Sequence, residues 1–185
     1  LVAAHIATAL QSIVARNVKP TDTAVLSVTQ IHGGDAYNVI PQQAVMRGTA
    51  RAFSHDTLTL LERNMARIAE GVAAGFGATA VLDFRRGFAP VVNDAAEAGF
   101  IADTAAELVG EANVNRNGSL VMASEDFSFM LERRPGAYIQ IGNGDGEGAC
   151  EVHNPAYDFN DAILPLGSTL FVRLAEKKLA RWPAN

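Results

Sequence analysis

Hydrophobic residues recur at helical spacing from the first residues of the chain. In LVAAHIATALQSIVAR the apolar side chains lie on one stripe of a helix, formed by Val2, Ile6, Leu10 and Ile13. The helix is followed by residues 23–31 (TAVLSVTQI), which are short, β-branched and partly alternating, and therefore predict a strand. A second strand is predicted over residues 44–53 (AVMRGTARAF), where alternate positions carry a polar stripe.

A second amphipathic helix follows, with Ser54 as its predicted N-cap. Its apolar positions are Leu58, Leu61, Met65, Ile68 and Val72, and the sequence GFG ends it. Residues 78–84 (ATAVLDF) then predict a third strand. Helix, strand, strand, helix, strand is the order of a βαββαβ two-layer unit that lacks its first strand. Because the chain opens inside a helical pattern, without an initiator Met or a cap, we expect it to be part of a longer protein.

A second unit is predicted to begin near Pro90. Asp94 and Glu97 form a capping-box pattern at the start of a helix that ends before Gly110. Ser124 is the expected cap of a short helix over residues 125–132, residues 136–142 (GAYIQIG) predict a short buried strand, and residues 165–180 predict a closing helix. The second unit therefore has the element pattern of an α/β fold.

Composition excludes several classes of protein. The 185 residues are 49% hydrophobic and 19% charged, with a net charge of −5 and no long run of one sign, so neither nucleic acid nor an anionic membrane surface is an expected partner. The single cysteine, Cys150, cannot form an internal disulfide, which fits a reducing compartment and predicts a cytoplasmic protein.

One of the four histidines, His153, lies in the loop sequence GACEVHNPAYDFND. A histidine next to Asn-Pro can present one ring nitrogen at a cleft, and Asp158 or Asp161 could orient the other nitrogen. The alternative is a surface histidine without a specific role. The spacing of Cys150 and His153 does not indicate a structural zinc site, since no second pair of this kind exists.

Two adjacent acids, Glu125 and Asp126, stand in ASEDF. Acids in the first turn of a helix interact favourably with its dipole, which explains both without a catalytic role. A catalytic carboxylate pair is the less favoured alternative, because adjacent helical residues diverge by about 100°.

The loop HGGDAYNVIP, between the two predicted strands, surrounds Asn38 with two glycines and Pro41. Arg51 follows thirteen residues later, near the end of the polar stripe. An asparagine and an arginine are a suitable pair for binding an amide carbonyl and a carboxylate. A long hairpin connection and a solvated strand charge are the simpler alternatives.

Three segments together, GGDAYNVIPQQAVMRGTAR, ASEDFSFM and HNPAYDFND, resemble the M20 metallopeptidases, in particular their hippurate hydrolase and N-acyl-amino-acid amidohydrolase branch. The resemblance implies an α/β protein with an α+β lid. Residues 1–88 would form a βαββαβ two-layer lid or dimerisation domain without its first strand. Residues 89–185 would form the C-terminal part of a three-layer α/β zinc-peptidase-like catalytic domain.

The resemblance also implies roles for individual residues. His153 matches a ligand of a dinuclear divalent metal site, which could hold zinc, manganese, nickel or cobalt. Asn38, Arg51 and Gly142 match substrate-contacting positions, the first two in the active site of a partner subunit. Glu125 matches a position that would support the metal site. The other ligands, the glutamate general base and an oxyanion-binding histidine belong to an N-terminal segment that this sequence does not contain, so we expect the chain alone to be inactive.

The implied function is hydrolysis of the amide bond of an N-acyl amino acid or a related small conjugate. In this chemistry paired metal ions activate a water molecule and a glutamate accepts its proton. The implied partners are a small-molecule substrate, a second copy bound through the lid, and the remaining part of the enzyme. The alternatives are a non-catalytic dimerisation or binding module, and the same fold acting on dipeptide or carbamoyl substrates.

Overall fold

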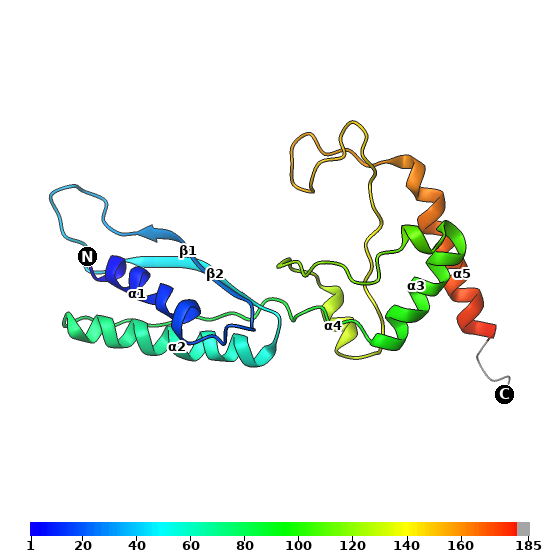
Figure 1. Cartoon of the computed structure of the whole chain (residues 1–185). Helices are drawn as coiled ribbons and strands as arrows, with labels where there is room; N and C mark the ends of the chain where they lie inside the picture. The colour runs from blue at the N-terminus through cyan, green and yellow to red at the C-terminus, as the bar shows by residue number, and fades with distance from the viewer. Residues whose placement is uncertain (181–185) are drawn as a thin grey trace. The chain divides into compact units, whose positions relative to one another are not determined.

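A computed structural model of the chain describes residues 1–180, and these form two compact units (Figure 1). The first unit comprises residues 1–91 and also residues 121–128, which return to it from later in the sequence. The second unit comprises residues 92–120 and 129–180.

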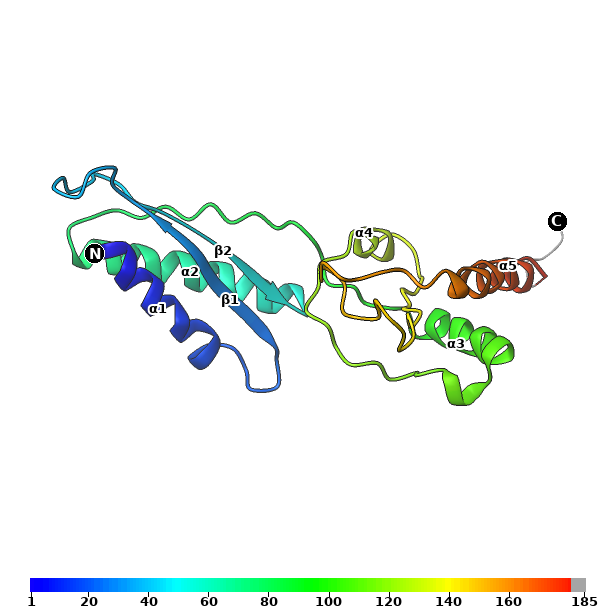
Figure 2. The same cartoon turned by 90° about the horizontal axis from the view of Figure 1, so that it is seen from above.

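The first unit contains helix α1 (Val2–Arg16), strands β1 (Ala24–His32) and β2 (Val45–Ala52), and helix α2 (His55–Gly75). Both helices lie on one side of the β1–β2 hairpin, and Figure 2 views the same unit from the side of the strands. The core lies between these layers and consists of Ile6, Leu10, Ile13, Leu26, Leu58, Leu61 and Ala73. The amphipathic stripes of the sequence therefore become the core, as predicted.

The start of α2 follows the predicted capping chemistry. The Ser54 side chain accepts a hydrogen bond from the backbone N–H of Thr57 at 3.1 Å. This contact satisfies one of the N–H groups that the first turn of a helix leaves without a partner. The predicted N-cap is confirmed.

Strands β1 and β2 pair in antiparallel register from Ala24↔Ala52 to His32↔Val45. The register shifts between Val28 and Gln30, so Thr29 forms a bulge. Gly48 lies opposite Val28 at this irregularity. A Cβ atom on Gly48 would lie 2.1 Å from the carbonyl oxygen of Ser27, which explains why this position is a glycine.

The third strand predicted over residues 78–84 is not formed. These residues alternate between half-buried and exposed positions as a strand would, with Ala78, Ala80 and Phe84 packed against the core. Within the described residues, however, the backbone from Thr79 to Phe84 makes no ladder hydrogen bond, and the sheet has only β1 and β2. The prediction was wrong because the alternating pattern reports on burial, whereas a strand also requires a paired backbone.

The second unit contains helix α3 (Ala95–Val109), the short 3₁₀ helices η1 (Glu111–Asn113) and η2 (Asp161–Ile163), and helix α5 (Leu164–Ala180). Asp94 caps α3 by accepting from the N–H groups of Ala96 and Glu97 at 3.0 Å, so this predicted helix start is confirmed. Helix α5 lies along α3, and Lys178 joins them by donating to the carboxylate of Glu97 at 2.6 Å.

Two further predictions are corrected by the structure. Residues 136–142 form no strand. Their first residues instead contact the segment just before α3: Nδ2 of Asn93 donates to the carbonyl oxygen of Tyr138, and Oδ1 of Asn93 accepts from the N–H of Tyr138. The short helix predicted after Ser124 is α4 (Phe127–Leu131), and Glu125 rather than Ser124 caps it. Within residues 1–180, no helix is long and apolar enough to cross a bilayer.

Candidate functional site

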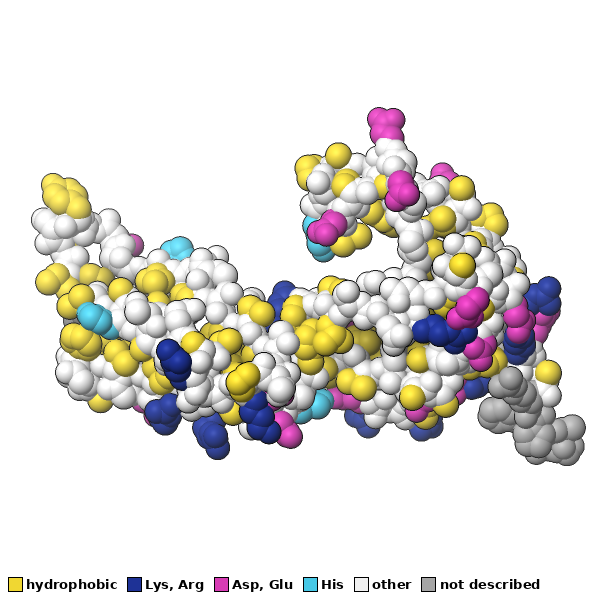
Figure 3. Space-filling model, viewed as in Figure 1, with side chains coloured by type: hydrophobic (Ala, Val, Ile, Leu, Met, Phe, Trp, Pro, Cys, Tyr) yellow, Lys and Arg dark blue, Asp and Glu magenta, His cyan; other side chains and the backbone are white. Residues whose placement is uncertain are grey.

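The loop that carries Asn38 projects from the hairpin, and all of residues 31–43 are exposed. Gly34 has a φ of 82°, and a Cβ atom added there would lie 3.6 Å from the ring of Pro41. Tyr37 and Ile40 are almost fully exposed at its tip, and Figure 3 shows hydrophobic side chains gathered there. Exposed apolar side chains around a polar amide are typical of a surface that contacts another molecule.

Arg51 lies in β2 opposite Val25 and is half-buried. Its Nη1 donates a hydrogen bond of 2.6 Å to the carbonyl oxygen of Met122. This contact attaches residues 121–128 to the first unit. The guanidinium group has five N–H donors, so the contact leaves donors for a second acceptor.

Asn38 and Arg51 are not brought together. The loop of Asn38 leaves the hairpin at the pair His32↔Val45, whereas Arg51 is six residues farther along β2. At a rise of about 3.3 Å per residue, this places Arg51 roughly 20 Å from the start of the strand. The two residues therefore lie toward opposite ends of the hairpin, and their contact with a substrate stays a prediction.

Glu125 lies in the segment that Arg51 attaches. Its side chain accepts from the N–H of Phe127 at 3.3 Å, and its carbonyl oxygen accepts from the hydroxyl of the fully buried Ser128 at 2.7 Å. These contacts hold Glu125 just before α4. The sequence predicted that Glu125 and Asp126 lie in the first turn of this helix, but α4 begins at Phe127 and has no acid in its first turn, so this prediction was wrong. Asp126 is exposed beside it.

His153 is exposed on a loop of the second unit and has a φ of 71°. It is the one residue other than glycine with a positive φ in the described part of the chain. The next residue, Asn154, makes a turn around Pro155, because its side chain accepts from the N–H of Ala156 at 2.9 Å. A non-glycine residue in the left-handed region is energetically costly, and such residues concentrate at functional sites.

The other predicted positions near His153 are placed as follows. Gly142 is exposed, and a Cβ atom there would meet nothing within 4 Å, so packing does not require this glycine. Between residues 1 and 180, neither Asp158 nor Asp161 forms a side-chain hydrogen bond with His153. Asp161 instead begins η2.

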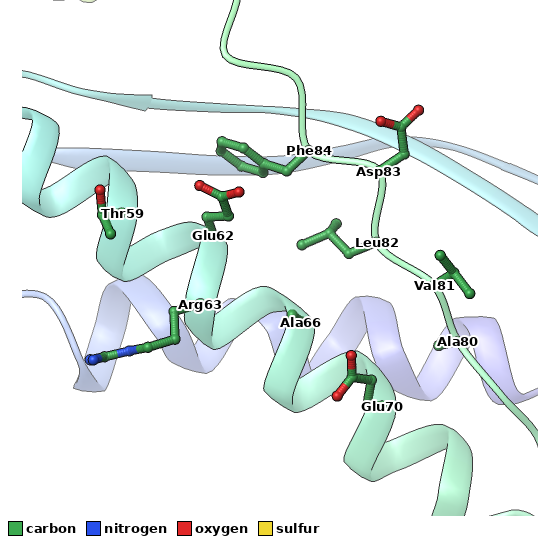
Figure 4. Close-up of a pocket in the computed structure, with 10 residues that line it drawn as sticks. All are labelled: Thr59, Glu62, Arg63, Ala66, Glu70, Ala80, Val81, Leu82, Asp83 and Phe84. Atoms are coloured by element: carbon green, nitrogen blue, oxygen red, sulfur yellow. The ribbon is translucent and has the colours of Figure 1, made fainter.

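A groove of about 640 Å³ lies between α2 and residues 80–84 of the first unit (Figure 4). Leu82 and Phe84 are directed toward α2, whereas Asp83 points away from it. Arg85 donates two hydrogen bonds to Asp83 and lowers the pKa of this exposed carboxyl group. None of the predicted site residues lines the groove, so it is separate from the residues that the sequence singled out.

Comparison with known proteins identifies the family. The family described as Peptidase family M20/M25/M40 matches residues 2–177. The chain belongs to this family.

Two relatives with known names support the assignment. The chain is 37% identical over 172 residues to a hippurate hydrolase of Campylobacter jejuni, covering 92% of this chain and 44% of that protein. It is 35% identical over 173 residues to an N-acetylcysteine deacetylase of Bacillus subtilis, covering 94% of this chain and 44% of that protein. The M20 chain thus spans less than half the length of these relatives.

A solved structure shares the fold of the M20 chain. It is a Bacillus subtilis protein described as a dinuclear metal binding peptidase from the M20 family. The match has a TM-score of 0.79 and 31% identity, and it covers 98% of this chain and 46% of that chain. The M20 chain therefore has the α/β fold of these peptidases.

The fit of a metal ion to the M20 chain can be tested from its own side chains. In the part that the structure describes, no group of three or more His, Cys, Asp or Glu side chains lies close enough together to hold a metal ion. A catalytic zinc site takes three protein ligands, whereas His153 is a single imidazole with no second candidate ligand beside it among the described residues. The described residues therefore do not form a metal site by themselves.

Proposed function

We propose that the M20 chain is part of a metal-dependent amidohydrolase that cleaves the amide bond of N-acyl amino acids or related small conjugates of the hippurate type. The observation that carries the proposal is the family match over residues 2–177, together with relatives that are named for acylated amino acids. The IAA-amino acid hydrolase of Arabidopsis thaliana, 31% identical over 191 residues, is a further relative named for an amino acid conjugate.

The first unit is proposed to be the lid and dimerisation domain, spanning residues 1–88. Its hairpin with two helices on one side supports this assignment, as does the strand-like burial of residues 78–84. A further strand that pairs with the backbone of residues 79–84 would extend the sheet. Residues 89–185 would belong to the catalytic domain.

Within this enzyme, His153 is proposed to be one ligand of the dinuclear site. Support comes from its exposure on a shaped loop and from its left-handed backbone, which needs the surrounding turn to maintain it. The remaining ligands would come from groups that residues 1–180 do not provide, and the chain alone would then not hydrolyse substrate. Glu125 would support the metal site through the segment that it caps.

Asn38 and Arg51 are proposed to contact substrate at different places, because they lie at opposite ends of the hairpin. The exposed tip around Asn38 would enter the active site of a second copy. Arg51 would bind a substrate carboxylate with the donors that Met122 leaves free. Gly142 would border the path of the substrate.

The test is a hydrolysis assay on the chain alone and on the chain combined with the N-terminal half that the proposal requires, with added Mn²⁺ or Zn²⁺. We expect release of amino acid from a panel of N-acyl substrates by the combination, and none by the chain alone. His153→Ala should abolish the release, whereas His32→Ala, which changes an exposed histidine of β1, should not.

Two results would contradict the proposal. The first is a folded combination that cleaves none of the N-acyl, dipeptide and carbamoyl substrates, which would favour a non-catalytic dimerisation module. The second is a His153→Ala variant with full activity.

A further inference from the structure

Two asparagines close the loop that carries His153. The backbone N–H of Asn160 donates to Oδ1 of Asn143 at 2.9 Å, and Nδ2 of Asn160 donates to the carbonyl oxygen of Asn143 at 3.1 Å. In addition, Nδ2 of Asn143 donates to the carbonyl oxygen of Asp158 at 2.8 Å. Three hydrogen bonds thus join the two ends of residues 144–159. We call this arrangement the amide clasp.

A second contact crosses the loop above the amide clasp. The N–H of Asp158 donates to the carbonyl oxygen of Gly148 at 3.1 Å. Gly148 has a φ of 81°, and a Cβ atom there would lie only 2.7 Å from the Cβ of Asp158. The close approach and the positive φ both require glycine at this position.

The amide clasp is connected to the helices of the second unit. Oδ1 of Asn160 accepts from the N–H of Ala162 at 3.0 Å and so caps η2, which leads directly into α5. Helix α5 is in turn joined to α3 by Lys178 and Glu97. The base of the loop is therefore anchored to the most regular part of the unit.

His153 occupies the centre of this closed loop, five residues after Gly148 and five before Asp158. Compact surface loops of up to about 16 residues with adjoining ends form a recognised class and are frequently functional. The position of His153 depends on where the two ends of the loop are fixed, because most of the loop between them is exposed. Amide groups that use several donors and acceptors at once give such a fixed point.

We propose that Asn143 and Asn160 are positioning residues that fix the place at which His153 is presented. The importance of this role for catalysis rests on the proposed function of His153, but the closure of the loop does not. Neither asparagine was singled out by the sequence, since two amides 17 positions apart leave no local pattern.

The test compares Asn143→Ala and Asn160→Ala with Asn117→Ala, which removes an exposed amide in the same unit. Amide hydrogen exchange is measured over residues 144–159, and the ring resonances of the four histidines are recorded by NMR. A lost hydrogen bond raises local exchange roughly fivefold, so the loss of two in Asn143→Ala should raise it at least about tenfold. The His153 resonance should move toward that of a mobile, solvated histidine, while those of His5 and His32 stay in place.

Gly148→Ala tests the same proposal without changing either asparagine, because the added Cβ atom pushes residue 148 away from Asp158. We expect the same displacement of the His153 resonance in this variant, which keeps the test valid if an asparagine variant fails to fold. The proposal is overturned if exchange over residues 144–159 matches that of Asn117→Ala. It is also overturned if exchange rises but the His153 resonance does not move, because the amide clasp would then close the loop without positioning the histidine.

The experiment uses neither metal nor substrate. A failure of the metal-site proposal would therefore leave the amide clasp intact, and a failure of the amide clasp would leave the metal analysis of His153→Ala unaffected.

Discussion

Replacing Gly48 by alanine tests the packing of the hairpin on which Asn38 and Arg51 depend. The new Cβ atom would lie 2.1 Å from the carbonyl oxygen of Ser27 and 3.1 Å from the Cα of Val28. Both are backbone atoms of the paired strand, so no side-chain rotation can relieve the contact and the two strands must move apart.

The magnitude follows from two opposing effects. Overpacking of this kind costs about 1–3 kcal/mol. Removing the excess backbone freedom of glycine recovers about 0.5–1 kcal/mol. With the middle of each range, we expect Gly48→Ala to lower the free energy of unfolding by about 1 kcal/mol, and by about 2 kcal/mol if a ladder hydrogen bond beside the bulge is also lost.

Gly71→Ala is the matched control. Gly71 lies inside α2, and a Cβ atom there would meet nothing within 4 Å. The same chemical change should therefore stabilise the helix by about 0.5–1 kcal/mol. Two glycine-to-alanine variants of one unit are thus expected to have opposite effects.

The assay is urea unfolding, monitored through the hydrogen exchange of peptides that cover β1 and β2. A local probe is needed because two compact units need not unfold together. With a urea dependence of about 2 kcal/mol per molar, a loss of about 1–2 kcal/mol lowers the midpoint by roughly 0.5–1 M. A Gly48→Ala midpoint equal to or above that of the unchanged chain would refute the close approach of the two strands.

Three further predictions concern packing, capping and charge. Leu61→Ala should cost about 2–5 kcal/mol in urea unfolding, because Leu61 is fully buried, whereas Leu179→Ala, at a position 70% exposed, should change stability by less than about 0.5 kcal/mol. Ser54→Ala should lower the stability of α2 by about 1 kcal/mol in the same assay, since its cap on Thr57 is lost. The hydrogen bond from Arg116 lowers the pKa of Glu111, so the pair stabilises the fold above the usual carboxyl pKa and this contribution is lost as the pH falls through the lowered value. In Arg116→Gln, a carbon-13 NMR titration should find the Glu111 pKa back in its usual range, and an unchanged pKa would contradict this cause.

The elements of the first unit were largely predictable from sequence. Helix α1, both strands and α2 follow from local periodicity, and Ser54 supplies a local cap signal. Local rules succeed here because each helix buries one stripe against the hairpin to which it is directly connected.

Residues 78–84 and 136–142 show the limit of the same reasoning. Both have the composition of strands, and residues 78–84 also have strand-like burial, but neither pairs with a neighbouring strand within residues 1–180. Pairing depends on a second segment, which the pattern of one segment cannot supply.

The candidate site was predictable in part. The sequence places His153 in a loop next to Asn-Pro, and the structure adds that its backbone is left-handed, which is uncommon for a residue other than glycine. The separation of Asn38 from Arg51 could not be read from their spacing, because it depends on where the hairpin turns. The amide clasp between Asn143 and Asn160 also has no local signal, since it joins distant residues through side-chain amides.

The quantity that tests the central claim most directly is the amount of bound metal. Three proteins would be compared: the unchanged chain, His153→Ala and His32→Ala. Each would be combined with the N-terminal half that the proposal requires, loaded with Mn²⁺ or Zn²⁺ and dialysed, and the number of metal ions bound per protein would then be measured. The account predicts that His153→Ala loses bound metal while His32→Ala retains it. Equal metal content in all three proteins would contradict the assignment of His153 as a ligand.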